Sequence, residues 1–233
     1  MLQKESVSGE LLALLKEIQS EDLFKDYVLG GGTALALQIG HRRSIDIDLF
    51  INKEQNNRLI LDFLNNKYSG FNLLNINKTI IELVIKNIKV DFIGTNQNIL
   101  EPPNYKEGIR FFGKKDIAAM KQQAVVYRNS ARDYIDIAYL LQEIPLKQMF
   151  ELYKQKYNTQ DVTIVKMALL ACKNVEAEYW KKDILMLKNN VDISGIPGLF
   201  EKEIKKYDKS KNIGANTDMP DLFNNLKKIF RKE

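Results

Sequence analysis

Two aspartates two residues apart, Asp46 and Asp48, lie in an apolar run that is typical of a β-strand. Since successive side chains of a strand point to opposite faces, both carboxylates are expected on the same face. Two adjacent acids repel each other unless a cation neutralises them, and divalent metals bind carboxylate oxygens. Glycines 30–32 precede them and open a short helix, where backbone N–H groups can approach an anion closely. Metal and phosphate together indicate chemistry on a nucleotide.

A third carboxylate, Asp91, lies in the middle of another apolar run, residues 88–93. A buried acid costs free energy unless it is paired or bound to a metal. If this strand lies beside strand 45–51, Asp91 joins Asp46 and Asp48. Three acids can then hold two Mg²⁺ ions, with Mn²⁺ as an alternative, for an in-line displacement. Asp91 would also accept the proton of an attacking hydroxyl. Taken alone, it equally fits a strand acid held in a salt bridge.

The loop before the two aspartates is polar and basic. Arg42, Arg43 and Ser44 can bind phosphate oxygens by charge-assisted hydrogen bonds. The single histidine, His41, fits a phosphate- or substrate-positioning role beside them better than that of a metal ligand or general acid. In the alternative interpretation, Arg42 or Arg43 pairs with Asp46 and holds the loop.

A predicted helix further along carries two basic residues on one face. Lys121, Ala124 and Arg128 are spaced by three and four residues and so share that face. On an otherwise apolar helix, Lys and Arg either meet an anion or extend their charged ends to water. Asp133 and Asp136 begin the next helix, where the helix dipole favours acids. For Asp136, a capping or salt-bridge role and a functional role both remain open.

Composition and charge limit the class of protein. The 233 residues, 45% of them hydrophobic and 28% charged, are typical of a globular chain of one or two domains. The single cysteine excludes an intramolecular disulfide, and the polar N-terminus and lack of a long apolar run predict a cytoplasmic protein without a membrane span. Residues 113–233 contain 22 Lys and Arg against 16 Asp and Glu. This excess suits a polyanionic partner or a lysine-rich solubilising surface.

The hydrophobic pattern predicts an α+β protein in two parts. Residues 1–112 mix short strands with helices and predict a mixed or antiparallel sheet, and residues 113–233 predict a helical domain that completes a cleft. Strands are expected at 27–29, 45–51, 71–76, 79–85, 88–93 and 109–112. Helices are expected at 8–19, 33–39, 55–66, 116–127, 131–142, 146–157, 162–173 and 177–188, with an amphipathic piece near 222–230.

These features together resemble the DNA polymerase β-type nucleotidyltransferase superfamily, and more specifically the nucleotidyltransferase AbiEii/AbiGii toxin family. The first block of that family has the form G-G-T-A-L followed by H-R-x-S-x-D-(I/L)-D-(L/F), and residues 31–35 and 41–50 match it. Residues 116–121, Arg128 and residues 132–136 match the second block. The resemblance weakens toward the C-terminus.

The resemblance implies a polymerase-β-like sheet and transfer of a nucleoside monophosphate from an NTP to an acceptor, with release of pyrophosphate. It also implies that Lys121 and Arg128 contact the triphosphate, that Lys121 helps to neutralise charge at the transferring phosphorus, and that Asp133 has a role in the site. The phosphate-binding residues of the glycine turn are then Gly31, Gly32 and Thr33.

The same resemblance implies a bacterial toxin of a toxin–antitoxin or phage-defence pair, with a cognate antitoxin. In some members of the family the acceptor is the 3′ end of tRNA, and the basic C-terminal half suits such an acceptor. Three alternatives are a protein or small-molecule acceptor, a catalytically silent member that binds RNA or a partner, and a glycosyltransferase. The three intact acids argue against the silent member, and the absence of a nucleotide-sugar domain of adequate length argues against the glycosyltransferase.

Overall fold

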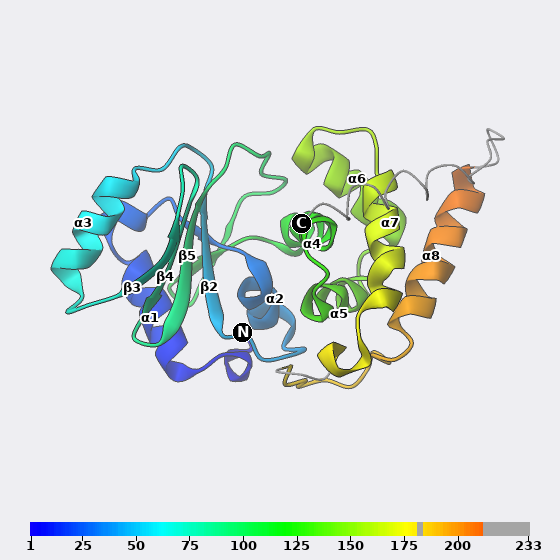
Figure 1. Ribbon diagram of the computed structural model, residues 1–233, viewed down its shortest axis with the longest axis horizontal. Coiled ribbons are helices and arrows are strands. Elements are labelled where there is room, and N and C mark those ends of the chain that lie inside the picture. Colours follow the sequence, from blue (N-terminus) through cyan, green and yellow to red (C-terminus); the bar gives the residue numbers. More distant parts are fainter. Residues whose placement is uncertain (181–183, 212–233) are drawn as a thin grey trace.

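The computed structural model describes residues 1–180 and 184–211, which form a mixed β-sheet followed by a lobe of helices (Figure 1). The strands are β1 (Val28–Leu29), β2 (Asp46–Ile51), β3 (Asn72–Ile76), β4 (Ile80–Ile85), β5 (Ile88–Gly94), β6 (Asn104–Lys106) and β7 (Ile109–Phe111). The α-helices are α1 (Gly9–Gln19), α2 (Gly31–Ile39), α3 (Asn57–Lys67), α4 (Lys114–Tyr127), α5 (Ala131–Leu140), α6 (Leu146–Tyr157), α7 (Thr163–Ala171) and α8 (Ile196–Lys211).

The strand order in the sheet is β3-β4-β5-β2-β1-β7-β6. β2 is parallel to β5 and β1 is parallel to β7, whereas the other neighbouring pairs are antiparallel. The β4–β5 hairpin turns through Lys86 and Asn87, whose φ angles of 50° and 64° suit a type I′ turn. The mixed sheet predicted from the sequence is confirmed.

Burial alternates along β2 and gives the sheet one apolar and one polar face. Ile47, Leu49 and Ile51 are buried in the core. Asp46 and Asp48 lie on the other, more open face. Helix α1 packs against β2 and β7, so the apolar residues are covered and the carboxylates are left accessible.

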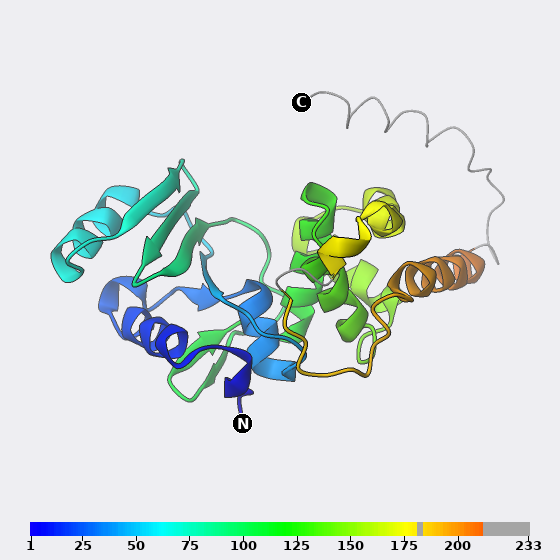
Figure 2. The same ribbon diagram turned by 60° about the horizontal axis from the view of Figure 1, so that its bottom comes forward.

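Helices α4 to α8 form the second lobe, and α2 lies between this lobe and the sheet (Figure 1, Figure 2). α2 contacts β2 on one side and both α4 and α5 on the other. A buried ion pair between Lys156 and Asp116, 2.6 Å apart, ties α6 to α4. Within residues 1–180 and 184–211, no helix is long and apolar enough to cross a membrane.

One predicted helix, 177–188, is wrong. Residues Ala177–Trp180 form a 3₁₀ turn, and the chain after residue 183 lies against the loop before β2. There the backbone N–H of Arg43 donates to the carbonyl of Leu185 at 2.8 Å, and that of Leu187 donates to the carbonyl of His41 at 2.9 Å. These tertiary backbone bonds outweigh the helical spacing of the apolar residues.

The other predicted strands and helices are present, with ends that differ by a few residues. The strand β6 and the helix α8 were not predicted. The amphipathic piece expected near 222–230 lies outside the described residues. The domain boundary expected between residues 112 and 113 falls between β7 and α4 and stays a prediction.

Candidate active site

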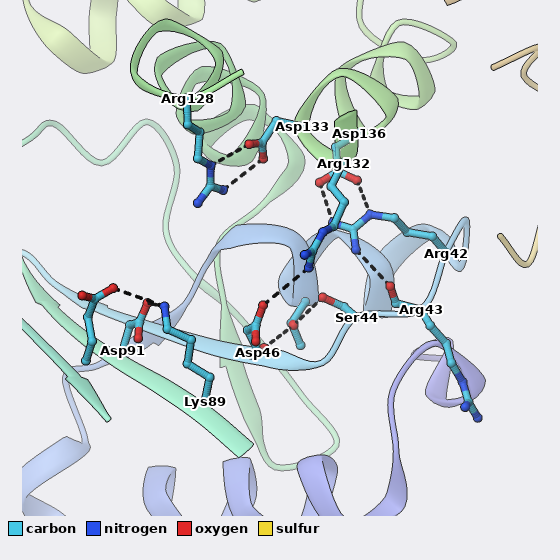
Figure 3. A network of polar contacts seen from close by, with 12 residues as sticks. Arg42, Arg43, Ser44, Asp46, Lys89, Asp91, Arg128, Arg132, Asp133 and Asp136 are labelled. Carbon is cyan, nitrogen blue, oxygen red and sulfur yellow. Dashed lines mark hydrogen bonds and ion pairs between the residues drawn. The ribbon is translucent and has the colours of Figure 1, made fainter. Parts of the chain in front are cut away.

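Asp46, Asp48 and Asp91 share the open side of the sheet, and we call this group the carboxylate face. In the parallel register of β2 and β5, Asp48 lies beside Asp91 and Asp46 lies beside Lys89. Figure 3 shows Asp46, Lys89 and Asp91 pointing toward the helical lobe. The condition for Asp91 to join Asp46 and Asp48, that these two strands are neighbours, is met.

The glycine turn at the start of α2 lies directly against Asp48. Gly31 has a φ of +63°, and a Cβ atom there would come within 1.9 Å of Asp48 Oδ2, so a side chain is excluded. The N–H of Gly30 donates to the carbonyl of Asp48 at 2.8 Å. The Thr33 hydroxyl donates to the carbonyl of Asp46. The N-terminus of α2, which can bind an anion, is therefore next to the carboxylate face.

Asp91 is 9% exposed, and only one of its carboxylate oxygens has a partner. Oδ2 accepts from Lys89 Nζ at 2.8 Å, whereas Oδ1 has no hydrogen-bond partner in the part of the chain that the structure describes. Burial raises the pKa of Asp91 to about 6, with the charge of Asp48 adding to the effect and Lys89 opposing it. Burial also raises the pKa of Asp48. A cation would relieve both carboxylates.

The three aspartates have the ligand type that a divalent metal prefers, but they are not already arranged around a metal position. Among residues 1–180 and 184–211, no group of three or more His, Cys, Asp or Glu side chains is arranged to hold a metal ion. Asp48 and Asp91 are nevertheless register neighbours, and Asp91 Oδ1 is buried without a partner, so the donor set fits a hard divalent cation. Asp46 faces Arg132, whose Nη1 lies 3.9 Å from its carboxylate. The three-aspartate metal site stays a prediction.

A second set of charges lies where the loop before β2 meets α4 and α5. We call it the buried cluster, and it consists of His41, Arg42, Lys121, Asp133 and Asp136. Asp136 is at its centre and accepts from Arg42 Nε at 2.7 Å and Arg42 Nη2 at 2.9 Å. Lys121 Nζ lies 2.6 Å from Asp136 and 2.7 Å from Asp133. His41 Nε2 lies 2.7 Å from Asp136 Oδ1.

The directions of the pKa shifts in the buried cluster indicate which of its side chains are charged at pH 7. Burial by itself raises the pKa of Asp136, but Arg42, Lys121 and the His41 hydrogen bond outweigh it and hold that pKa well below its usual value. Burial lowers the pKa of His41, with Arg42 and Lys121 adding to the effect and Asp136 opposing it. His41 is therefore neutral at pH 7, with its Nε2–H donating to Asp136.

These contacts change the interpretation of three predicted phosphate ligands. His41, Arg42 and Lys121 are 0%, 3% and 3% exposed, and their polar atoms are directed at carboxylates. The carboxylate that Arg42 pairs with is Asp136, rather than Asp46 as the alternative interpretation had it. Direct phosphate contact by these three residues stays a prediction that this geometry does not favour, and a role in positioning the site fits better.

Two other arginines are accessible. Arg128 and Arg132 point from the helical lobe toward the sheet (Figure 3). Arg128 donates to Asp133 from Nε at 2.7 Å and from Nη2 at 3.2 Å, and its side chain remains 66% exposed. Asp133 thus binds both Lys121 and Arg128. The common helix face predicted from their spacing does not extend to Arg128, because α4 ends at Tyr127 and the backbone of Arg128 is extended. An exposed guanidinium opposite carboxylates suits a polyphosphate that lies between them.

The remaining predicted phosphate ligands have different surroundings. Arg43 is exposed and points away from the network (Figure 3). Ser44 and Thr33 are buried and joined by a hydrogen bond of 2.8 Å between their hydroxyls. A Cβ atom at Gly32 would come within 2.4 Å of Arg42 Nη2, so this glycine leaves room for the Arg42 side chain. Gly32 and Ser44 therefore line the path of Arg42 into the buried cluster.

An apolar cavity of about 630 Å³ opens between the end of α4 and α7. Tyr127, Arg128 and Asn129 contribute to its wall on one side, and Ile164 and Met167 on the other. The three aspartates of the carboxylate face are not in its lining. Arg128 therefore borders both this cavity and the space above the carboxylates.

Sequence reasoning did not assign Lys89, Glu82 or Arg132, and it left Asp136 open. Two of them had a usable signal. Lys89 precedes Asp91 by two residues in a strand, so the alternation rule places both on one face. A two-residue turn in the β4–β5 hairpin sets Glu82 opposite Asp91. The partners of Arg132 and Asp136 come from segments far away in the sequence, so no local pattern identifies them.

The family described as "Nucleotidyl transferase AbiEii toxin, Type IV TA system" matches residues 13–202, which include the carboxylate face, the buried cluster and Arg128. The chain belongs to this family. It is therefore a nucleotidyltransferase of a toxin–antitoxin family, and the resemblance noted in the sequence is confirmed. The AbiEii-family chain is also 30% identical, over 198 residues, to "Uncharacterized protein aq_aa25" of Aquifex aeolicus, a match that covers 83% of this chain and 93% of that protein.

Solved structures of similar architecture include a putative nucleotidyltransferase from H. pylori, with a TM-score of 0.48 at 16% identity, covering 88% of this chain and 95% of that one. The nucleotidyltransferase toxin MenT4 from Mycobacterium tuberculosis has a TM-score of 0.41 at 14% identity, covering 83% and 81%. The assignment to the AbiEii family comes from the sequence match and does not depend on these structures. An α+β nucleotidyltransferase fold, an NTP substrate and an antitoxin partner follow from the family.

Proposed function

We propose that this AbiEii-family enzyme transfers a nucleoside monophosphate from an NTP to the 3′ end of tRNA, and that Mg²⁺ or Mn²⁺ is required. One observation carries the proposal. Asp48 lies against the N-terminus of α2 and beside Asp91, and a buried oxygen of Asp91 has no partner in the described residues. Carboxylates that repel each other beside an anion-binding helix end are the arrangement that a metal–nucleotide complex stabilises.

The triphosphate is proposed to lie between the start of α2 and the exposed side of Arg128. Because Gly31 has no side chain, the Asp48 carboxylate lies directly against the start of α2, and a phosphate bound by the backbone N–H groups there would be next to it. Arg128 is held by Asp133 and directs its accessible guanidinium toward the sheet. Lys121 and Arg42 are proposed to act indirectly. Their ion pairs with Asp133 and Asp136 hold in place the helical lobe from which Arg128 and Arg132 extend.

In the reaction, Asp91 accepts the proton of the acceptor hydroxyl as the hydroxyl oxygen attacks the α-phosphorus. The bond from that phosphorus to the bridging oxygen breaks, and pyrophosphate leaves toward the α2 and Arg128 side. Asp46, Asp48 and Asp91 would hold the divalent cation, which when bound supplies positive charge to the phosphoryl oxygens. A carboxylate within hydrogen-bond reach of the attacking hydroxyl can serve as its general base.

An RNA acceptor is supported by charge. The C-terminal half of the chain, residues 113–233, contains 22 Lys and Arg against 16 Asp and Glu. The described helices of this half, α4 to α8, form the lobe toward which the carboxylates of Asp46 and Asp91 point, so a polyanion bound at the carboxylate face would lie beside this lobe. A protein or small-molecule acceptor would not require an excess of positive charge on this lobe.

The test uses purified protein, each of the four NTPs labelled at the α-phosphate, either Mg²⁺ or Mn²⁺, and total cellular RNA. We expect label in RNA of tRNA size with at least one NTP, and none with Asp48→Asn. Asp26→Asn is the matched control, because it makes the same chemical change at an exposed acid that pairs with Lys53. Label found only in protein would show that the acceptor is a protein hydroxyl and not RNA. The absence of label with every NTP and with both metals would overturn the proposal.

Toxicity provides a separate test in cells. Induced expression is expected to arrest growth, and co-expression of the neighbouring antitoxin gene is expected to restore it. Asp48→Asn should leave growth unchanged at equal protein level, whereas Asp26→Asn should arrest it as the wild type does. Growth arrest by Asp48→Asn would show that toxicity does not come from nucleotidyl transfer.

A further inference from the structure

A row of polar side chains crosses four neighbouring strands and includes the proposed general base, Asp91. We call it the polar row, and it consists of Asp48, Asp91, Glu82 and Asn75. Asp48 pairs in register with Asp91, Asp91 with Glu82, and Glu82 with Asn75. Register partners in a sheet have neighbouring side chains on one face. The row therefore runs along the open face, from β2 to the edge strand β3.

Glu82 is ordered by two hydrogen bonds and is still accessible. Its Oε2 accepts from Asn75 Nδ2 at 2.9 Å and its Oε1 accepts from Lys89 Nζ at 3.2 Å. Lys89 also donates to Asp91 at 2.8 Å, so one ammonium group holds both carboxylates in place. The Glu82 side chain is 30% exposed. The hydrogen bonds from Asn75 and Lys89 lower the pKa of Glu82, which is therefore an ionised group that can only accept further hydrogen bonds.

The direction of the reaction places the acceptor over this part of the row. In an in-line displacement the attacking and leaving oxygens are on opposite sides of the phosphorus. The glycine turn follows β1, which lies on the side of β2 away from β5, so the triphosphate side is the β1 side of Asp48. The acceptor hydroxyl must then come from beyond Asp91, where β4 supplies Glu82 as the next polar side chain.

We propose that Glu82 is a specificity-determining residue that accepts a hydrogen bond from the 2′-hydroxyl of the acceptor's terminal ribose, while Asp91 takes the proton of the 3′-hydroxyl. The inference rests on the proposed function and names the group by which an RNA end is recognised. Two neighbouring carboxylates held by Lys89 match the two neighbouring hydroxyls of a ribose. The 2′-hydroxyl is the group that distinguishes RNA from DNA at such a site.

The rival explanation is that Glu82 only orients Lys89, which in turn orients Asp91. The two explanations differ in what they predict for an acceptor without a 2′-hydroxyl. If Glu82 acts only through Lys89, its loss slows transfer to ribose and deoxyribose ends by the same factor. If Glu82 binds the 2′-hydroxyl, its loss slows transfer to the ribose end alone, because the deoxyribose end never made that contact.

The experiment compares kcat/KM for tRNA ending in adenosine with that for tRNA ending in 2′-deoxyadenosine. For the wild type we expect a preference for the ribose end of about 10- to 100-fold, as for a hydrogen bond to a charged group. For Glu82→Ala we expect the ratio to fall to within about threefold of unity, by loss of activity on the ribose end, and for Glu82→Gln, whose amide oxygen still accepts a neutral hydrogen bond, we expect a ratio between those of Glu82→Ala and the wild type. Glu54→Gln, which changes an exposed glutamate paired with Lys78, is the matched control and should keep the wild-type ratio.

The outcomes separate this inference from the proposed function. A wild-type ratio near one, or Glu82 variants that lose activity equally on both ends, would overturn the role of Glu82 while leaving RNA transfer in place. Failure of the wild type to modify tRNA of either kind would overturn the proposed function and the inference with it. Melting temperatures of the variants, read beside the ratios, confirm that each protein is folded. The ratio itself does not depend on the folded fraction.

Discussion

The carboxylate face and the buried cluster are built from the same residue types, yet their charges are balanced differently. In the buried cluster every aspartate accepts from at least two basic groups, and the pKa values of Asp133 and Asp136 are lowered despite burial. On the carboxylate face the pKa values of Asp48 and Asp91 are raised by burial, and Asp91 keeps an oxygen without a described partner. The first arrangement holds lobes together, and the second leaves binding capacity for a ligand.

The largest expected effect separates activity from stability on the carboxylate face. Asp48→Asn removes a proposed metal ligand, and we expect nucleotidyl transfer to fall by about 1,000-fold, which corresponds to about 4 kcal/mol of transition-state stabilisation. The free energy of unfolding should be unchanged or higher, because the burial that raises the pKa of Asp48 penalises its charged form. Label transfer measures the expected loss of activity, and urea unfolding of the same preparation measures the free energy of unfolding. A variant that is less stable but active would reverse the assignment.

For the buried cluster we expect a substitution to lower the stability of the protein. Asp136→Asn leaves Arg42 and Lys121 without their shared anion, and we expect a loss of about 3–5 kcal/mol in the free energy of unfolding. Urea unfolding monitored by circular dichroism measures it. Asp26→Asn, at an exposed pair, should cost at most about 1 kcal/mol. Equal stabilities for the two variants would contradict a structural role for Asp136.

The sequence predicted the carboxylate face better than the buried cluster, and the reason is physical. Strand alternation is a local rule, so Asp46 and Asp48 could be placed on one face, and Asp91 joins them on the single condition that strand 88–93 is a neighbour, which the register meets. The cluster depends on which acid the loop arginine meets, and Asp136 lies 94 residues beyond Arg42. Helical spacing also put Lys121 and Arg128 on one face without showing that one is buried and the other exposed.

The error at 177–188 has the same origin. Its apolar residues are spaced as in a helix, but residues after 183 instead hydrogen-bond the loop that carries His41 and Arg43. The conformation of this segment is set by backbone hydrogen bonds to residues 41–43, which are far away in the sequence, so local spacing does not predict it. The fold class was therefore predictable, whereas the partner of each charged residue was not.

A smaller effect tests whether only the carboxylate face binds a cation. At a Mg²⁺ concentration of about ten times its Kd, the wild type should gain about 1.4 kcal/mol, which raises Tm by roughly 3–6 °C for a chain of this size. Thermal melting with and without Mg²⁺ measures the shift. Asp48→Asn should lose it, and Asp26→Asn should keep it. An undiminished shift in Asp48→Asn would place the cation elsewhere.

A last effect is the contribution of His41, in the buried cluster, to the pH dependence of stability. The folded state lowers the pKa of His41 because of burial, with Arg42 and Lys121 adding to the effect, so below its ordinary pKa of 6.5 the unfolded chain binds a proton that the folded chain does not. The stability that neutral His41 contributes is thus present above pH 6.5 and lost as the pH falls. The slope is at most about 1.4 kcal/mol per pH unit, the limit for one proton.

His41→Gln isolates this effect, because its amide can still donate to Asp136 but does not titrate. Asp91, with a pKa of about 6, titrates in the same range and stabilises the metal-free protein as the pH falls, so a single curve mixes both regions. The difference between wild type and His41→Gln cancels the Asp91 contribution. We expect the free energy of unfolding of the wild type to fall relative to that of His41→Gln as the pH is lowered from 6.5 to 5. A difference that stays constant over that range would mean that His41 is not held neutral, and that the cluster tolerates a further positive charge.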